Sequence, residues 1–204
     1  MPLRGIYALV DAGLTARPLA LLEAILAGGV RIVQYRAKNG VDRTLVARLH
    51  ELTRAASALL IVNDDLQAAL DADGLHVGQE DLALLDASAL RVALSGRLLG
   101  VSCGTPAEAR AAARLGADYL GVGPYARTVT KDDAGDPLGI EGLREVIAAS
   151  SAPVAAIGGI GRDQLPGVVR SGVSMAAIAS AIALAPDPLG MTRELVTGWN
   201  ALTA

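Results

Sequence analysis

Residues 98–123 read LLGVSCGTPAEARAAARLGADYLGVG and hold one complete strand, helix and strand unit. The apolar runs 98–103 and 119–123 have the length and composition of buried strands. Between them, residues 106–115 carry apolar residues at helical spacing, and Thr105-Pro106-Ala107-Glu108 is typical of a helix start. A strand, a helix and a second strand in this order predict neighbouring parallel strands in an α/β fold.

The same alternation runs through the whole chain. We predict strands at 5–11, 31–36, 58–63, 74–78, 98–103, 119–123, 153–158 and 173–179. We predict helices at 17–28, 43–57, 66–72, 86–94, 106–115, 140–150, 162–171 and 187–202. Eight such units and no linker predict that residues 1–204 form a single (β/α)8 TIM barrel. A doubly wound open sheet is the alternative, but the sequence shows no switch point for it.

The composition limits the class of protein and its partners. Hydrophobic residues make up 52% of the 204 residues, which is enough for a large core. The net charge of −3 argues against nucleic acid or an anionic membrane surface as a partner. A single cysteine cannot form an intrachain disulfide, and no run resembles a signal peptide or membrane span. We therefore expect a soluble cytoplasmic enzyme.

A cationic cluster ends the second predicted strand. In a (β/α)8 barrel the carboxyl ends of all strands surround one mouth, where the active site lies. Alternation places Gln34, Arg36 and Lys38 on one side of the strand. Their donors suit the many oxygens of a phosphate or pyrophosphate. The alternative is a solvated strand end with incidental charges.

Two acidic clusters follow the third and fourth predicted strands. They are Asn63-Asp64-Asp65 and Gln79-Glu80-Asp81. Oxygen ligands from two segments, without histidine or cysteine at zinc-like spacing, favour Mg²⁺ shared with substrate phosphates. Asp65 and Asp81 could instead cap the helices that follow them.

The fifth predicted strand ends in Ser102-Cys103-Gly104-Thr105. A hydroxyl here could reach an anion or cap the next helix. Cys103 lies in an apolar strand without a nearby histidine, so we interpret it as a packing residue. His76, within the fourth predicted strand, is interpreted as structural for a similar reason.

Residues 124–139 form the longest irregular stretch, and it contains Thr128, Thr130 and Lys131. These hydroxyl and ammonium groups suit capture of a phosphate, and the loop could close over the mouth. A flexible surface connection is the alternative.

A second anion site is predicted after the last two strands. The seventh predicted strand ends in Gly158-Gly159, and the eighth ends in Ala179-Ser180. Backbone amides at glycines and at a short helix start can bind a phosphate in this part of a barrel. Two anion sites in one mouth indicate an enzyme with two phosphorylated substrates.

Together these motifs resemble the thiamine-phosphate synthase family over nearly the whole chain. That family joins 4-amino-2-methyl-5-hydroxymethylpyrimidine diphosphate to a thiazole phosphate and releases pyrophosphate. The resemblance rests on the segments YALVD, Gln34-x-Arg36-x-Lys38, Asn63-Asp64-Asp65, DGLHVGQEDL, GVS, GADYLGVGP, Thr128-x-Thr130-Lys131, AIGGI and ASAI.

The resemblance implies a role for each matching residue. The pyrimidine diphosphate would be contacted by Gln34, Arg36, Lys38, Asn63, Ser102 and Lys131, and the Mg²⁺ would be held by Asp64 and Asp81. The thiazole phosphate would be held by Thr128, Thr130, Gly159, Ala179 and Ser180. It implies a dissociative reaction, in which pyrophosphate departs with help from Mg²⁺, Arg36, Lys38, Lys131 and Ser102 before the thiazole nitrogen attacks. A homo-oligomer is possible.

The sequence departs from the family pattern at several places. The interval from Asn63 to Asp81 is slightly short, and Gly104 stands where a histidine is common in the family. Residues 125–127 read Tyr-Ala-Arg, where an apolar, aromatic and proline run is usual. The alternatives are a thiazole tautomerase-like paralogue, whose proton-transfer histidine Gly104 cannot replace, and a non-catalytic phosphate-binding barrel.

Overall fold

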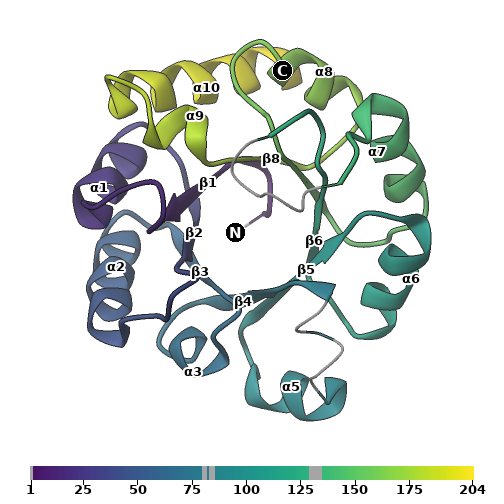
Figure 1. The fold of residues 1–204 in the computed structure, drawn as a ribbon, viewed down its shortest axis with the longest axis horizontal. Helices are drawn as coiled ribbons and strands as arrows, with labels where there is room; N and C mark the ends of the chain where they lie inside the picture. Colours follow the sequence, from purple (N-terminus) through teal and green to yellow (C-terminus); the bar gives the residue numbers. More distant parts are fainter. Residues whose placement is uncertain (1, 80–81, 83–85, 129–134) are drawn as a thin grey trace.

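A computed structural model of the chain describes residues 2–79, 82, 86–128 and 135–204. Within these residues, parallel strands pair in sequence order from β1 to β8, and β8 pairs with β1 to close a barrel. Helices surround the strands as an outer ring (Figure 1). The predicted (β/α)8 fold is confirmed.

The eight strands are β1 (Gly5–Asp11), β2 (Ile32–Arg36), β3 (Leu59–Asn63), β4 (Gly74–Val77), β5 (Leu98–Cys103), β6 (Tyr119–Val122), β7 (Val154–Ile157) and β8 (Met175–Ile178). The described helices are α1 (Pro18–Ala27), α2 (Arg43–Ala55), α3 (Leu66–Ala69), α5 (Ala87–Ala93), α6 (Pro106–Arg114), α7 (Gly139–Ala148), α8 (Leu165–Arg170), α9 (Ser180–Ala183) and α10 (Pro188–Thr203). In the described part of the chain, no helix has the length and apolar character needed to cross a membrane.

The predicted elements agree with the structure in order, and several boundaries were wrong. Helix α3 ends at Ala69 instead of residue 72. Helix α8 begins at Leu165 instead of residue 162, with a proline in its first turn, where a missing N–H costs nothing. The short helix α9 was not among the eight predicted helices. It lies between β8 and α10, which begins after the Asp187 cap.

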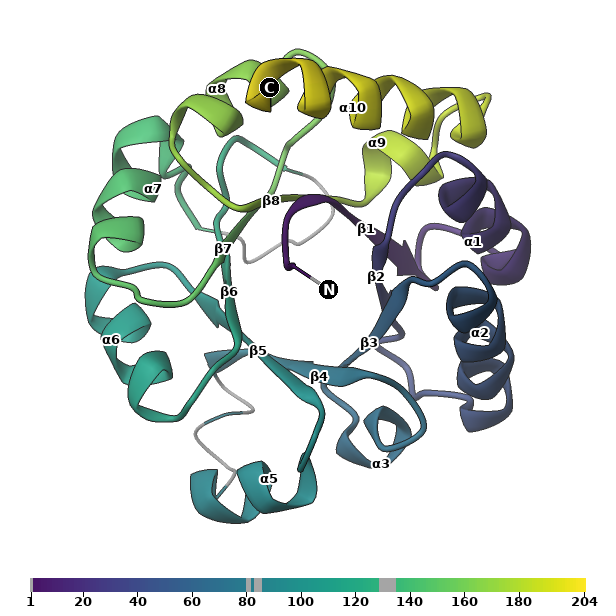
Figure 2. The same ribbon diagram turned by 180° about the vertical axis from the view of Figure 1, so that it is seen from behind.

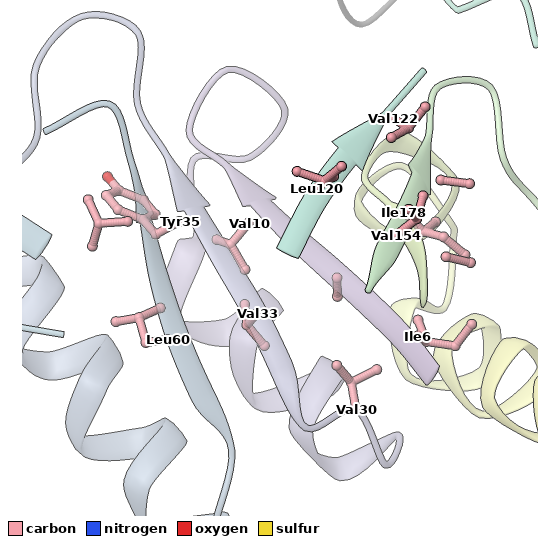
Figure 3. Close-up of a cluster of buried hydrophobic side chains, with 14 of the residues drawn as sticks. Ile6, Val10, Val30, Val33, Tyr35, Leu60, Leu120, Val122, Val154 and Ile178 are labelled. Carbon is pink, nitrogen blue, oxygen red and sulfur yellow. The ribbon is translucent and has the colours of Figure 1, made fainter. Parts of the chain in front are cut away.

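Alternation along the strands creates two separate apolar layers. Side chains such as Ile6, Val10, Val33 and Leu60 point outward and pack under the helices (Figure 3). Full burial of one such side chain contributes about 1.5–3 kcal/mol, so this outer layer is the main stabilising core. The intervening residues of each strand face the barrel interior and form the inner layer.

The inner layer contains a second cluster of buried apolar side chains. It contains Leu9, Ile32, Ile61 and Met175, and Leu3 packs against the same cluster. The described residues that precede β1 lie over the centre of the ring of strands, on the side of their amino ends (Figure 2). The interior is therefore filled at this end, which leaves the carboxyl ends of the strands for a binding site.

Candidate active site

The carboxyl ends of the strands carry most of the predicted site residues. Strand β2 supplies Gln34 and Arg36, and Lys38 follows it as an exposed residue. Strand β3 ends at Asn63, and Ser102 lies in β5. These residues are on different strands of one closed barrel, so they share its mouth. The predicted residues Asp81, Thr130 and Lys131 lie outside the described residues.

Arg36 is held by a carboxylate that the sequence analysis missed. Its Nη1 donates to Asp11 Oδ2 at 2.7 Å, and Asp11 Oδ1 accepts from the Gly13 amide at 2.8 Å. Asp11 and Arg36 are also direct neighbours in the register of β1 and β2. The Asp11 side chain is only 7% exposed, so this charge pair is shielded from water. Its position at the end of the first strand was the available signal.

The backbone at the end of β3 is in an unusual conformation. Asp64 has a φ of +62°, a value that residues other than glycine rarely adopt. Its amide donates to the carbonyl of His76 at 2.8 Å, and its Oδ2 accepts from Asn63 Nδ2 at 2.5 Å. Such strain costs about 1–3 kcal/mol and is common at functional sites. The turn presents the exposed Asp64 carboxylate at the mouth.

The neighbouring Asp65 has a structural role. Its side chain accepts a hydrogen bond from the amide of Ala68 at 2.9 Å and so caps α3. The capping interpretation is therefore confirmed for Asp65. For Asp81 that interpretation and the metal interpretation both stay predictions.

The residues at this position fit a Mg²⁺ ion in part. Among the described residues, no group of three or more histidine, cysteine, aspartate or glutamate side chains gathers to hold a metal. Mg²⁺ commonly needs only one or two carboxylates, because waters and substrate phosphates complete its shell. The exposed carboxylate of Asp64 matches that requirement.

At the end of β5, the two hydroxyls have different contacts. Thr105 caps α6, since its Oγ1 accepts from the amide of Glu108 at 3.2 Å. Ser102 Oγ lies 3.0 Å from His76 Nε2 inside the barrel. Cys103 is buried, and burial together with nearby Glu108 raises the pKa of its thiol to about 12. The packing interpretation of Cys103 is confirmed, and the capping residue is Thr105.

A chain of hydrogen bonds crosses the barrel interior between Gln34 and Ser102. Gln34 Nε2 donates to the Tyr7 hydroxyl at 2.8 Å, and the hydroxyls of Tyr7 and Tyr119 are 2.7 Å apart. The Tyr119 hydroxyl lies 3.0 Å from His76 Nδ1. The contact between His76 Nε2 and Ser102 completes the chain.

The groups in the middle of this chain are uncharged at neutral pH. Burial raises the pKa values of Tyr7 and Tyr119 and lowers that of His76 to about 4. The sequence did not lead us to predict a role for Tyr7 or Tyr119, or the contact between His76 and Ser102. The available signal was their inward position in the strand alternation, shared with Gln34 and Ser102.

After β7 the chain makes a glycine turn against the loop that follows β6. Gly158 and Gly159 have φ values of +96° and +63°. The amides of Tyr125 and Ala126 donate to the carbonyls of Ile157 and Gly158 at 2.8 and 3.0 Å. A side chain at Gly159 would come within 2.9 Å of the Ala126 carbonyl oxygen. This docking brings the segment that leads to Thr128 next to the glycine turn.

Ala179 and Ser180 stand at the start of α9, directly after β8. Because β7 and β8 are neighbours, this helix start and the glycine turn lie at adjacent strand ends. Both segments are half-buried at the mouth. The described residues of the predicted second anion site are therefore brought together, whereas Thr130 lies outside the described residues.

Comparison with known proteins gives a consistent result. The chain matches a family described as "Thiamine monophosphate synthase" over residues 6–182. It is 43% identical to the thiamine-phosphate synthase of Chloroflexus aurantiacus, over 93% of this chain and 90% of that protein. It is 43% identical to the thiamine-phosphate synthase of Archaeoglobus fulgidus, over 94% and 91% of the two chains. Among solved structures, thiamine phosphate pyrophosphorylase from Pyrococcus furiosus superposes with a TM-score of 0.88 and 31% identity, covering 99% and 98%.

Proposed function

This chain belongs to the thiamine monophosphate synthase family, and we propose that it joins 4-amino-2-methyl-5-hydroxymethylpyrimidine diphosphate to thiazole phosphate, giving thiamine phosphate and pyrophosphate. The main support within the structure is the position of Arg36, fixed by Asp11 at the mouth of the barrel. A cation held in place before the substrate arrives loses little freedom when it binds an anion.

The pyrimidine diphosphate would bind over β2, β3 and β5. Arg36 offers a planar set of donors to the diphosphate oxygens, and the exposed Lys38 adds a second positive charge. Gln34, in the middle of β2, and Asn63, at the end of β3, are amides on neighbouring strands and suit the polar edge of the pyrimidine. Ser102 and Lys131 complete the proposed set on the basis of the family resemblance.

Asp64 would hold a Mg²⁺ ion beside the diphosphate, with Asp81 as the proposed second ligand. The ion, when bound, would neutralise charge that develops on the departing pyrophosphate. Asn63 donates to one oxygen of Asp64, so the orientation of that carboxylate is fixed. The Asp64 carboxylate is the proposed metal ligand.

The proposed reaction breaks the bond between the methylene carbon of the pyrimidine and the diphosphate oxygen. The bonding electrons leave with pyrophosphate, and the pyrimidine ring stabilises the resulting methylene cation. The lone pair of the thiazole nitrogen then forms the new carbon–nitrogen bond. Arg36, Lys38 and Lys131 stabilise the negative charge on pyrophosphate, and the two bound substrates would limit the access of water to the cation.

The thiazole phosphate would bind at the glycine turn and the start of α9. Gly159 has no side chain, so the loop after β6 can pack against the turn, and the Gly159 amide is the proposed donor to the phosphate. The amide and hydroxyl of Ser180, the Ala179 segment, and the hydroxyls of Thr128 and Thr130 are the proposed further donors.

Pyrophosphate release with each substrate alone and with both together tests this function. We expect release that depends on Mg²⁺ and on the presence of both substrates. Isomerisation of the thiazole precursor without joining would instead indicate a tautomerase. Binding of both substrates in calorimetry without any turnover would indicate a phosphate-binding protein. Either result would overturn the proposal.

A further inference from the structure

The hydrogen-bond chain inside the barrel joins two residues of the proposed pyrimidine diphosphate site. Its ends are Gln34 on β2 and Ser102 on β5, and its middle members are Tyr7, Tyr119 and His76 from β1, β6 and β4. None of the three middle residues was given a role in the proposed reaction. All three are buried, with exposed fractions of 2%, 0% and 7%.

The barrel makes room for this chain with two glycines. A Cβ atom at Gly100 would lie 2.5 Å from His76 Nδ1 and would overlap the Tyr119 phenol. A Cβ atom at Gly121 would lie 2.9 Å from His76 Cε1. The Tyr119 ring also packs edge-on against Tyr7, with centroids 5.7 Å apart. The positions of the polar atoms are therefore fixed by close packing on every side.

The consecutive hydrogen bonds of the chain are consistent with two directions of donation. In one, Gln34 N–H donates to Tyr7, Tyr7 to Tyr119, Tyr119 to His76 Nδ1, and His76 Nε2–H to Ser102. In the other, every donor and acceptor is exchanged, and the Gln34 carbonyl oxygen must face Tyr7. A mixed arrangement leaves a buried hydroxyl or ring nitrogen without its partner, which is costly.

The two directions offer opposite groups to a ligand. In the first, the Ser102 hydroxyl proton is free to donate, and the Gln34 carbonyl oxygen is free to accept. In the second, Ser102 offers only lone pairs, and the Gln34 carbonyl oxygen is directed at Tyr7, so that the N–H groups of Gln34 face the ligand. Diphosphate oxygens accept hydrogen bonds, whereas the exocyclic amine of an aminopyrimidine donates them. The first direction complements both parts of the substrate.

We propose that Tyr7, Tyr119 and His76 are positioning residues that fix Ser102 as a donor to the diphosphate and Gln34 as an acceptor for the pyrimidine amine. This inference rests on the proposed function, because it names how that function's first substrate is oriented. The neutral state of His76 is consistent with it, since a neutral imidazole donates from one nitrogen and accepts at the other.

The tautomer of His76 tests the direction of the chain without any turnover. The chain contains only two histidines, so ¹⁵N NMR of the labelled protein gives two pairs of imidazole nitrogen signals, and the His50→Gln variant assigns them. In the presence of inorganic pyrophosphate and MgCl₂, we expect His76 to carry its proton on Nε2. A proton on Nδ1, or on both nitrogens at pH 7, would overturn the proposal.

Kinetics of Tyr119→Phe test the positioning role. This variant keeps the ring and cuts the chain, and we expect kcat/KM for the pyrimidine diphosphate to fall ~5- to 10-fold with an unchanged KM for thiazole phosphate. Tyr35→Phe removes a hydroxyl from the outer layer and serves as the matched control, with no change expected. If Tyr119→Phe does not fold, Tyr7→Phe replaces it, because it removes the hydroxyl that joins Gln34 to Tyr119. We expect the same fall in kcat/KM for this variant.

A double-mutant cycle separates positioning from general stability. In a Ser102→Ala background, cutting the chain at Tyr119 should lower kcat/KM by a smaller factor than in the wild-type protein, because only the Gln34 end of the chain is left to lose its orientation. Additive losses, or an equal loss in Tyr35→Phe, would overturn the proposal. If the wild-type protein lacked synthase activity, the NMR result would still be informative, so the two failures can be told apart.

Discussion

The guanidinium of Arg36 and the carboxylate of Asp11 lie 2.7 Å apart at the carboxyl ends of neighbouring strands, and the carboxylate is almost fully buried. Since Asp11 also accepts the Gly13 amide, it fixes the cation in one orientation. We expect Asp11→Asn to lower kcat/KM for the pyrimidine diphosphate roughly ten-fold, because Arg36 loses a charge-assisted hydrogen bond. Steady-state kinetics at saturating thiazole phosphate measure this.

The exposed pair of Arg43 and Asp71 provides the control for that variant. It joins the same two residue types on the surface, where an ion pair contributes little. Asp71→Asn should therefore leave kcat/KM unchanged. If both variants lost activity to the same degree, Asp11 would have no special part in the site.

Replacing Asp64 tests the proposed metal ligand. Asp64→Ala should lower the rate roughly 100-fold or more at low Mg²⁺ and raise the Mg²⁺ concentration needed for half-maximal rate. Asp65→Asn is the matched control, since asparagine also caps a helix and the neighbouring carboxylate has no metal role. A magnesium titration of the rate for both variants gives the answer. An unchanged titration in Asp64→Ala would show that the metal assignment is wrong.

Gly159→Ala should weaken the binding of thiazole phosphate and leave the binding of the pyrimidine diphosphate unchanged. The position has a φ of +63°, and an added Cβ would collide with the backbone of Ala126 and Arg127. We expect a loss of about 1 kcal/mol or more in the free energy of unfolding and a raised KM for thiazole phosphate. Gly172→Ala has comparable backbone strain in open space, so it should lose stability and keep its KM. Denaturant unfolding and initial rates distinguish the two variants.

The buried thiol gives a prediction about pH. Burial and Glu108 raise the pKa of Cys103 to about 12, so the native thiol should resist alkylation at pH 8 and react on unfolding. The folded pKa lies above the unfolded value of 9.0. The stabilisation is therefore fully present below pH 9 and is lost as the pH rises towards 12. Mass spectrometry after iodoacetamide treatment checks this, and rapid native labelling would contradict the buried position.

Much of the fold could be predicted because strand and helix periods are local signals. A few neighbouring residues are enough to predict that Gln34 and Arg36 lie on the same side of their strand. The same holds for the helix cap at Thr105. The early end of α3 and the extra helix α9 depend on how the chain returns to the barrel, and short helices have weak sequence signals.

The partners of the site residues could not be predicted for a different reason. Arg36 and Asp11 are 25 residues apart, and Tyr7 and Tyr119 are 112 residues apart. Strand alternation tells which side chains point inward, but barrel register and side-chain rotamers decide which of them touch. The positive φ of Asp64 is likewise a tertiary property, because no local motif at 63–65 requires it.

The proposed synthase activity is tested most directly by the stoichiometry of the products in one reaction mixture. Thiamine phosphate and pyrophosphate, quantified by chromatography after incubation with both substrates and Mg²⁺, should appear in equal amounts, and neither should form when one substrate is omitted. Pyrophosphate release without formation of thiamine phosphate, or the absence of both products, would contradict the proposed synthase activity.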